Sequence, residues 1–433
     1  MSNFGEKHPW ACETTELDYD FKQLAQTDIQ SDYFSSLTPK GSIQASNPLL
    51  FVVDGTGDFV DLSRTVIKMT VSMTDGKGGD IVAATKAAPI NNIIHSMFSQ
   101  ITVSIGDQII SHPNNLYAHR SYLENLLTYG TDSKRTWMKS QGWYQDDAGQ
   151  FDTEANSSFA QRKAVVLDGR HLKLKARLHT DINFQKRLIP SNLDIKFNLT
   201  LNRPEFVVQS FAGPGKPFAL NIIDCTMIVR KVKLFPQRQL TFERSISKAP
   251  ITIPFNNVQM KTFSLAQGLT AYSQDSIYAG ALPSLVIFGM VDNKALTGDY
   301  PSSPFNFKNF SLSNLQLVLN GQTVPSQGLN LDFDHDDIID GYETLNDALG
   351  HQFDDRSHDI THALYKSGAA LYAFNLNPAG ECAQDVMSQT GVVDLHVKFK
   401  NPLPNTVSLI CYAQFQGSVK IDKFRNVVME TAG

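Results

Sequence analysis

Residues 193–201 read Leu-Asp-Ile-Lys-Phe-Asn-Leu-Thr-Leu, a regular alternation of apolar and polar side chains. Successive side chains of a strand point to opposite faces, so this period of two predicts a strand with one buried and one solvated face. The same alternation recurs at residues 67–73, 101–105, 315–319, 395–399, 407–415 and 419–423. Many short strands of this kind predict an all-β protein.

Other segments add detail to the predicted strands. Residues 227–234 lose their alternation at Arg230-Lys231, which predicts a β-bulge or a change of face. Residues 258–265 and 285–288 are further candidate strands. Asn320-Gly321 follows a strand and is a typical two-residue hairpin turn.

Helical periodicity is rare. Residues 115–129 have apolar side chains at helical spacing, and a second helix is expected near residues 338–349. Few helices, many strands and long polar connections favour β-sandwiches or jelly rolls. Both halves end alike, with a turn at 189–192 or 403–406 that leads into a long alternating strand, which suggests a duplicated fold.

Length and composition set the organisation. The chain has 433 residues, too many for one hydrophobic core. We expect an N-terminal arm at 1–45, a first domain at 46–238 and a second at 239–433, because 1–45 are polar without a sustained period and 237–250 follow a long strand. Only 19% of residues are charged, against 27 Phe and 13 Tyr, so part of the apolar surface is expected to be buried between subunits.

Charge and cysteines exclude several classes of protein. The net charge of −5 argues against a protein that mainly coats DNA, which needs a dense basic face. The cysteines, Cys12, Cys225, Cys382 and Cys411, are far apart, so we expect no disulfide framework and no zinc site, and a reducing compartment. No run of 18 apolar residues predicts a membrane span, and residues 1–10 contain no apolar signal-peptide core.

One acidic segment has the pattern of a cation site. Its carboxylates recur with the spacing of a calcium loop, and the candidate metal ligands are Asp332, Asp334, Asp336 and Glu343. Position six of that loop is Asp337, where the sharp turn requires Gly. The preferred interpretation is a solvated acidic loop, so we expect no metal.

Enzyme motifs are incomplete or absent. His358 and His362 have zinc-peptidase spacing, but Asp359 stands where that chemistry requires Glu; a surface loop or a short helix is the preferred interpretation. The sequence contains no phosphate-binding loop, no G-x-S-x-G elbow and no H-x-H pair of the cupin type. No catalytic residue or cofactor is therefore expected.

A modest basic stretch lies in the first half. Its members are Lys163, Arg170, Lys173, Lys175, Arg177, Lys186 and Arg187. The preferred explanation is that these residues occupy solvated strand and loop positions. The functional alternative is that they form a surface that faces DNA or a neighbouring subunit.

Nine short stretches in the same order give the chain a family resemblance. It resembles the hexon-like major capsid proteins of Polinton (Maverick) elements and adintoviruses. The stretches are DFVDLSRT (58–65), PINNIIHSMFSQ (89–100), YLENLLTYG (122–130), VRKV (229–232), GMVDN (289–293), PFNFK (304–308), YAFNL (372–376), PLP (402–404) and IDKFRNV (421–427).

This resemblance implies a non-enzymatic capsid protein of a double-stranded DNA virus or virus-like element. It implies two tandem eight-stranded jelly rolls with a few short helices in loops, and a homotrimeric, pseudo-hexagonal capsomer of an icosahedral shell. The implied partners are other copies of the chain, a single jelly-roll penton protein and cement or minor capsid proteins. The implied place is the virion capsid, assembled inside the host cell, with at most non-specific contact with DNA.

Two other classes of function stay open. One is a β-sandwich that binds a carbohydrate or a receptor, which would be a monomer or a small oligomer with a shallow site. The other is a metal-dependent enzyme that uses His358, His362 and the acidic segment, which would bind stoichiometric zinc.

Overall fold

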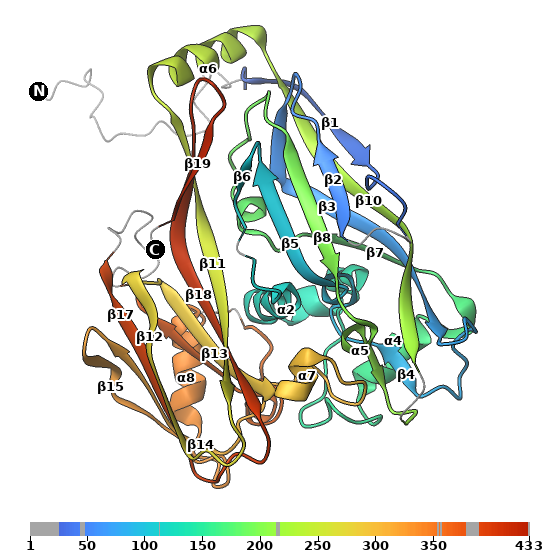
Figure 1. Cartoon of the computed structure of the whole chain (residues 1–433), viewed down its shortest axis with the longest axis vertical. Coiled ribbons are helices and arrows are strands. Elements are labelled where there is room, and N and C mark those ends of the chain that lie inside the picture. The colour runs from blue at the N-terminus through green and yellow to red at the C-terminus, as the bar shows by residue number, and fades with distance from the viewer. Residues whose placement is uncertain are drawn as a thin grey trace, which may run out of the picture.

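The protein consists of two β-sandwiches that lie side by side, one from each half of the chain (Figure 1). The computed structural model describes residues 26–43, 48–111, 113–213, 217–352, 355, 357–377 and 389–431.

The first sandwich has two four-stranded antiparallel sheets, named here after a central strand. The β10 sheet has the order β1 (Ile29–Leu37), β10 (Phe218–Leu234), β3 (Phe59–Asp75), β7 (Leu172–Arg177). The β8 sheet has the order β2 (Leu49–Val53), β8 (Ile195–Leu201), β5 (Phe98–Ile105), β6 (Gln108–Ile109). A small ladder pairs β4 (Ala87–Pro89) with β9 (Val208–Ser210).

The second sandwich repeats this plan. The β18 sheet has the order β11 (Ile251–Leu265), β18 (Val407–Ile421), β13 (Leu285–Asp292), β16 (Leu371–Asn375), and β19 (Val427–Thr431) pairs with the end of β18. The β17 sheet has the order β12 (Ala271–Ala281), β17 (Thr390–Phe399), β14 (Leu312–Leu319), β15 (Gln322–Asn330).

The two sandwiches have one topology. If β4, β9 and β19 are set aside and the remaining strands of each sandwich are counted in chain order, one sheet has the order first, eighth, third, sixth. The other sheet has the order second, seventh, fourth, fifth in both sandwiches. This is the eight-stranded jelly roll, present twice, and it confirms the predicted fold class.

The N-terminal stretch differs from its description as an arm. Residues 29–37 form β1, the first strand of the first roll, which pairs with β10 along its length. The strand was missed because it lies at the sheet edge with most of its side chains exposed, so no apolar period marks it. Residues 1–25 lie outside the described part of the chain.

Helices lie mainly in the connections. They are α1 (Ile93–Ser96), α2 (Tyr117–Thr128), α3 (Thr131–Arg135), α4 (Ser157–Ala164), α5 (Pro204–Val207), α6 (Pro236–Lys248), α7 (Asn293–Thr297), α8 (Ile339–Ala348) and α9 (His362–Lys366), with 3₁₀ turns η1 (Trp137–Gln141), η2 (Leu167–Gly169) and η3 (Asp181–Phe184). α2 and α8 confirm the two predicted helices. α6 joins the rolls where only a boundary was expected, and Pro236 at its first position suits a helix start.

Several strand details follow the sequence. The register between β10 and β3 shifts between Ile228 and Arg230, which confirms the predicted bulge. Asn320 and Gly321 have φ angles of 50° and 83°, as a two-residue hairpin turn between β14 and β15 requires. The segment 419–423 is not a separate strand, because β18 continues unbroken to Ile421.

Apolar side chains of both rolls merge at their contact. Ile253 and Val419 of the second roll pack into the core of the first, and Leu123 and Leu126 of α2 belong to the core of the second. The rolls are therefore joined by a continuous apolar contact. Cys225 and Cys411 are buried free thiols, while Cys12 and Cys382 lie outside the described residues.

Candidate functional site: the junction between the jelly rolls and the charged surfaces

A buried ion-pair cluster joins the two rolls. Arg120 on α2 donates from Nε to Glu124 Oε1 at 2.8 Å and from a terminal nitrogen to Asp181 Oδ1 at 2.6 Å. Asp181 on η3 also accepts the backbone N–H of Val258, on β11 of the second roll, at 3.0 Å. One guanidinium therefore holds together a helix, a turn and the first strand of the other roll.

Glu124 extends this cluster to β18. Its Oε2 lies 2.5 Å from His179 Nδ1, and its Oε1 accepts the Tyr412 hydroxyl at 3.4 Å. Burial alone would raise the pKa of Glu124, but Arg120 and His179 reverse that effect and lower it to about 2. For Asp181, burial outweighs Arg120, so its pKa is raised. Through Asp181 and Glu124, the charged residues of the first roll therefore make hydrogen bonds to two strands of the second roll.

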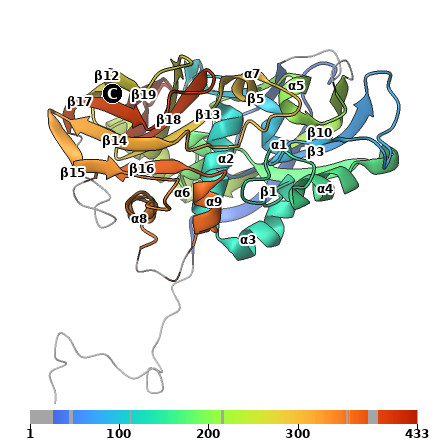
Figure 2. The ribbon, with the colours of Figure 1, turned by 90° about the horizontal axis from the view of Figure 1, so that it is seen from below.

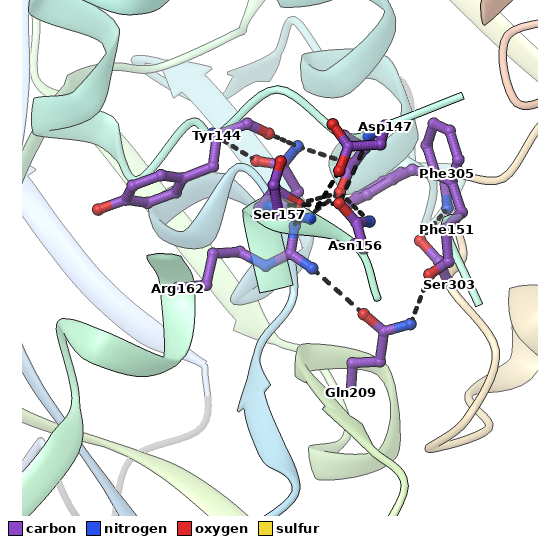
Figure 3. A network of polar contacts seen from close by, with 12 residues as sticks. Tyr144, Asp147, Phe151, Asn156, Ser157, Arg162, Gln209, Ser303 and Phe305 are labelled. Atoms are coloured by element: carbon purple, nitrogen blue, oxygen red, sulfur yellow. Dashed lines mark hydrogen bonds and ion pairs between the residues drawn. The ribbon is translucent and has the colours of Figure 1, made fainter. Parts of the chain in front are cut away.

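A second polar network stabilises the long connection between β6 and β7 (Figure 3). Asp146 accepts hydrogen bonds from Asn91 at 2.7 Å and Asn156 at 2.9 Å, and it also accepts the hydroxyl of Ser158. Its ion pair with Arg162 measures 2.9 Å, and both side chains are buried. Both oxygens of the Asp146 carboxylate have hydrogen-bond partners. The network is therefore a rigid structural support, and Asp146 is not a free reactive group.

The same connection reaches the second roll a few residues later. Asp152 accepts the backbone N–H of Ser303 at 2.7 Å and the Asn306 amide at 2.8 Å. Lys308 lies 3.2 Å from Asp152 and 2.6 Å from Asp292. The connection at residues 144–158 thus contacts the second roll, in addition to the Arg120 cluster.

Three of the four candidate metal ligands are paired with basic side chains. Asp332 pairs with His335 at 2.8 Å and Lys400 at 3.1 Å, Asp336 pairs with Lys366 at 2.7 Å, and Glu343 is exposed on α8. Lys400 also pairs with Asp334 at 2.9 Å. Among the described residues, no group of three or more His, Cys, Asp or Glu side chains could hold a metal ion.

We expect calcium to leave the stability of the protein unchanged. Asp332, Asp334 and Asp336 are paired with lysines, so the binding of calcium would have to break those pairs. Thermal unfolding with and without ~1 mM calcium should give the same midpoint, because only a ligand that binds the folded state raises it. A clear upward shift would show that the acidic segment binds calcium.

The histidine pair does not form a catalytic site. His362 begins α9, whereas His358 lies in the preceding loop, so the two rings do not share one helix face. His358 is buried rather than on a surface loop, and burial, reinforced by His351, lowers its pKa to about 4. Its Nδ1 accepts the N–H of Ile360 at 3.2 Å. A neutral, buried imidazole in this position supports the fold.

The chain was compared with known proteins. No family model matches it. An uncharacterized protein of Caenorhabditis elegans is 26% identical over 422 residues, which cover 94% of this chain and 99% of that protein.

Solved structures give a whole-chain likeness. A chain in the structure of the Sputnik virophage has a TM-score of 0.60 at 14% identity and covers 100% of this chain and 95% of its own length. The mavirus major capsid protein has a TM-score of 0.58 at 11% identity, with coverage of 100% and 96%. A chain of the PBCV-1 virus capsid has a TM-score of 0.58 at 14% identity, with coverage of 96% and 99%. This chain has the double jelly-roll fold.

The predicted basic stretch separates into different environments. Lys173 and Lys175 are exposed on β7, at the edge of the β10 sheet, while Leu174 and Ala176 between them are buried. Arg177 lies over the ring of Phe184, 4.2 Å from its centroid. The outer face of this sheet is thus positively charged along β7.

As for membranes, the described residues include no helix long and apolar enough to span one.

Sequence reasoning missed the residues of the junction. Arg120 and Glu124 stand four apart on a helix that was predicted, so their ion pair could have been inferred from spacing. Asp181 and Tyr412 carry no such signal, because 61 residues separate Asp181 from Arg120 and 288 separate Tyr412 from Glu124.

Proposed function

We propose that this chain is the major capsid protein, of the hexon type, of a double-stranded DNA virus or virus-like element. The observation that supports this most is the tandem pair of jelly rolls with identical strand order, locked together by the Arg120 cluster. Three such chains in a closed head-to-tail ring would present six similar lobes, which tile a hexagonal lattice. Likeness to the mavirus major capsid protein and the PBCV-1 capsid chain supports the same function.

The proposal includes the limits of the domains. We place the first roll from β1 at residue 29 to the end of β10 at 234, and the second from β11 at residue 251 onward. α6 is then the connector. This moves the first boundary from residue 46 to residue 29 and keeps the second close to residue 239.

The finer assignment rests on sequence resemblance. We propose a capsid protein of the Polinton or adintovirus type, located in the virion capsid and assembled inside the host cell. Its partners would be its own copies, a penton protein with one jelly roll, and cement or minor capsid proteins. Contact with DNA would be non-specific at most, and no enzyme activity, cofactor or metal is part of the proposal.

The first test of the proposed function is the mass of the assembled protein in solution. Light scattering after size exclusion should give about 144 kDa, three times the 48.1 kDa of the chain. Negative-stain images of that peak should show a three-fold particle with a pseudo-hexagonal outline. A stable monomer that never assembles at any salt or protein concentration would refute a capsomer and favour a carbohydrate- or receptor-binding protein.

A further inference from the structure

Equivalent sheets of the two rolls differ in how they are covered. In the β18 sheet, residues 407–413 of β18 and 286–292 of β13 are buried on both faces. In the β10 sheet, residues 65–74 of β3 and 225–230 of β10 alternate between buried and partly or fully exposed residues. One sheet of the same topology is therefore covered within the chain, and its counterpart has an open outer face.

Part of the cover of the β18 sheet comes from the connection between the fifth and sixth strands of the first roll, and part comes from α8 of the second roll, which packs on β16. That connection contains α2, whose Glu124 accepts the hydroxyl of Tyr412. Tyr412 lies on the outer face of β18, because the neighbouring Cys411 contacts Tyr278 of β12 inside the roll. Helices of one roll thus pack on the next roll along the chain.

The second roll has an equivalent connection, between β15 and β16, which contains α8. The inner side of α8, with Leu345 and Ala348, is buried. Its outer side carries Asp340, Glu343 and Asp347, all exposed and spaced to form one stripe along the helix. In the part of the chain that the structure describes, none of these three carboxylates has an ion-pair partner.

The open face of the β10 sheet carries the opposite charge along β3 and β7, while β10 adds one exposed acidic residue to this face, Asp224, opposite Thr70. Lys68 of β3 stands directly opposite Lys175 of β7, and both point away from the core. Lys173 lies on the same face, two residues from Lys175. Like charges directly opposite each other on adjacent strands destabilise a sheet unless an anion neutralises them. Over the described ranges, none of these lysines is paired with a carboxylate.

We propose that the acidic stripe of α8 (Asp340, Glu343 and Asp347) docks on the lysine face of β3 and β7 (Lys68, Lys173 and Lys175) of a second copy of this chain. The proposal rests on the head-to-tail capsomer proposed above and specifies which surfaces meet in it. Two observations support it, the opposite charges and the repeated topology. In a closed ring, α8 would cover the next β10 sheet as α2 covers the β18 sheet.

The two surfaces cannot meet within one chain. Seen from below, α8 lies at the end of the molecule formed by the second roll, and β3 and β10 lie at the other end (Figure 2). The junction between the rolls separates them, with α2 in the middle of the same view. Head-to-tail contact between copies brings such opposite ends together.

Charge reversal tests the contact. Lys173→Glu with Lys175→Glu should raise the protein concentration at which the trimer dissociates by roughly tenfold or more, and Asp340→Lys with Glu343→Lys should do the same. A chain carrying all four changes should assemble like the wild type, because each interface regains opposite charges. Concentration-dependent light scattering measures all three variants.

Arg244→Glu with Lys248→Glu is the matched control, because it makes the same change of charge on exposed positions of α6, away from both surfaces. It should leave the trimer unchanged, and thermal unfolding should show that every variant is folded. A wild-type trimer that all reversals leave intact would overturn the docking while sparing the proposed function. Failure of the fourfold variant to recover assembly would also overturn it. A monomeric wild type would instead refute the proposed function itself.

Discussion

Replacing Arg120 by methionine is expected to lower the free energy of unfolding by about 3–5 kcal/mol, the usual cost of removing one partner of a buried ion pair. Methionine keeps much of the side-chain volume but leaves Glu124 and Asp181 as buried carboxylates without their cation. Because Asp181 also accepts the N–H of Val258, the contact between the rolls should weaken as well. Urea unfolding monitored by circular dichroism measures the loss.

Two further variants serve as controls for the effect of Arg120→Met. Arg244→Met removes an exposed arginine on α6 and should change stability by less than about 0.5 kcal/mol. Arg120→Met combined with Glu124→Gln and Asp181→Asn removes the uncompensated charges and should recover part of the loss. If Arg120→Met is as stable as the wild type, the cluster does not hold the rolls together.

Acid is expected to destabilise the protein between pH 6.5 and pH 4. Burial lowers the pKa of His119 to about 4, and burial with the nearby His351 lowers that of His358 to about 4, against an ordinary value of 6.5. Near pH 5 the unfolded chain therefore binds protons at these histidines and the folded protein does not. The contribution of these neutral histidines to the free energy of unfolding is complete above pH 6.5 and is lost as the pH falls to about 4. At pH 5 each histidine has lowered the free energy of unfolding by about 2 kcal/mol.

Carboxyl groups with a lowered pKa, such as Glu124, should add little to the loss above about pH 5, because the unfolded chain begins to protonate them only near their ordinary pKa of 4.5. Unfolding free energy measured in urea from pH 8 to about pH 5 therefore gives the slope that the histidines cause. His119→Gln should make that slope shallower, since glutamine can still donate to the Pro304 carbonyl that His119 contacts at 3.2 Å. His171→Gln, at an exposed position, should not. Equal slopes in all three proteins would contradict the assignment to buried imidazoles.

The predicted strands show where sequence reasoning succeeds. β5, β8 and β17 alternate regularly because each has one face in a core and one toward a more polar surface. The bulge near Arg230 was also visible, since a break in period moves side chains to the other face. β1 and β12 were missed, because strands at a sheet edge bury few side chains and carry little periodic signal.

The contacts at the junction between the two rolls could not be predicted from local sequence patterns. Asp181 stands in a 3₁₀ turn and Val258 in a strand of the other roll, and neither position shows in its own segment that the two will meet. The same holds for Asp146, which receives hydrogen bonds from residues as far apart as Asn91 and Asn156. A buried carboxylate looks the same in a sequence as a solvated one until its neighbours are known.

By itself the sequence determined the fold class, the central strands of the four large sheets, the helices α2 and α8, and the charge of the acidic and basic segments. These are properties of single segments, set by side-chain period and composition. Only the tertiary structure decided which carboxylates are buried beside Arg120, which are exposed along α8, and which sheet has an open face. Burial and pairing depend on residues distant in the chain, because folding brings them together only when the two rolls pack.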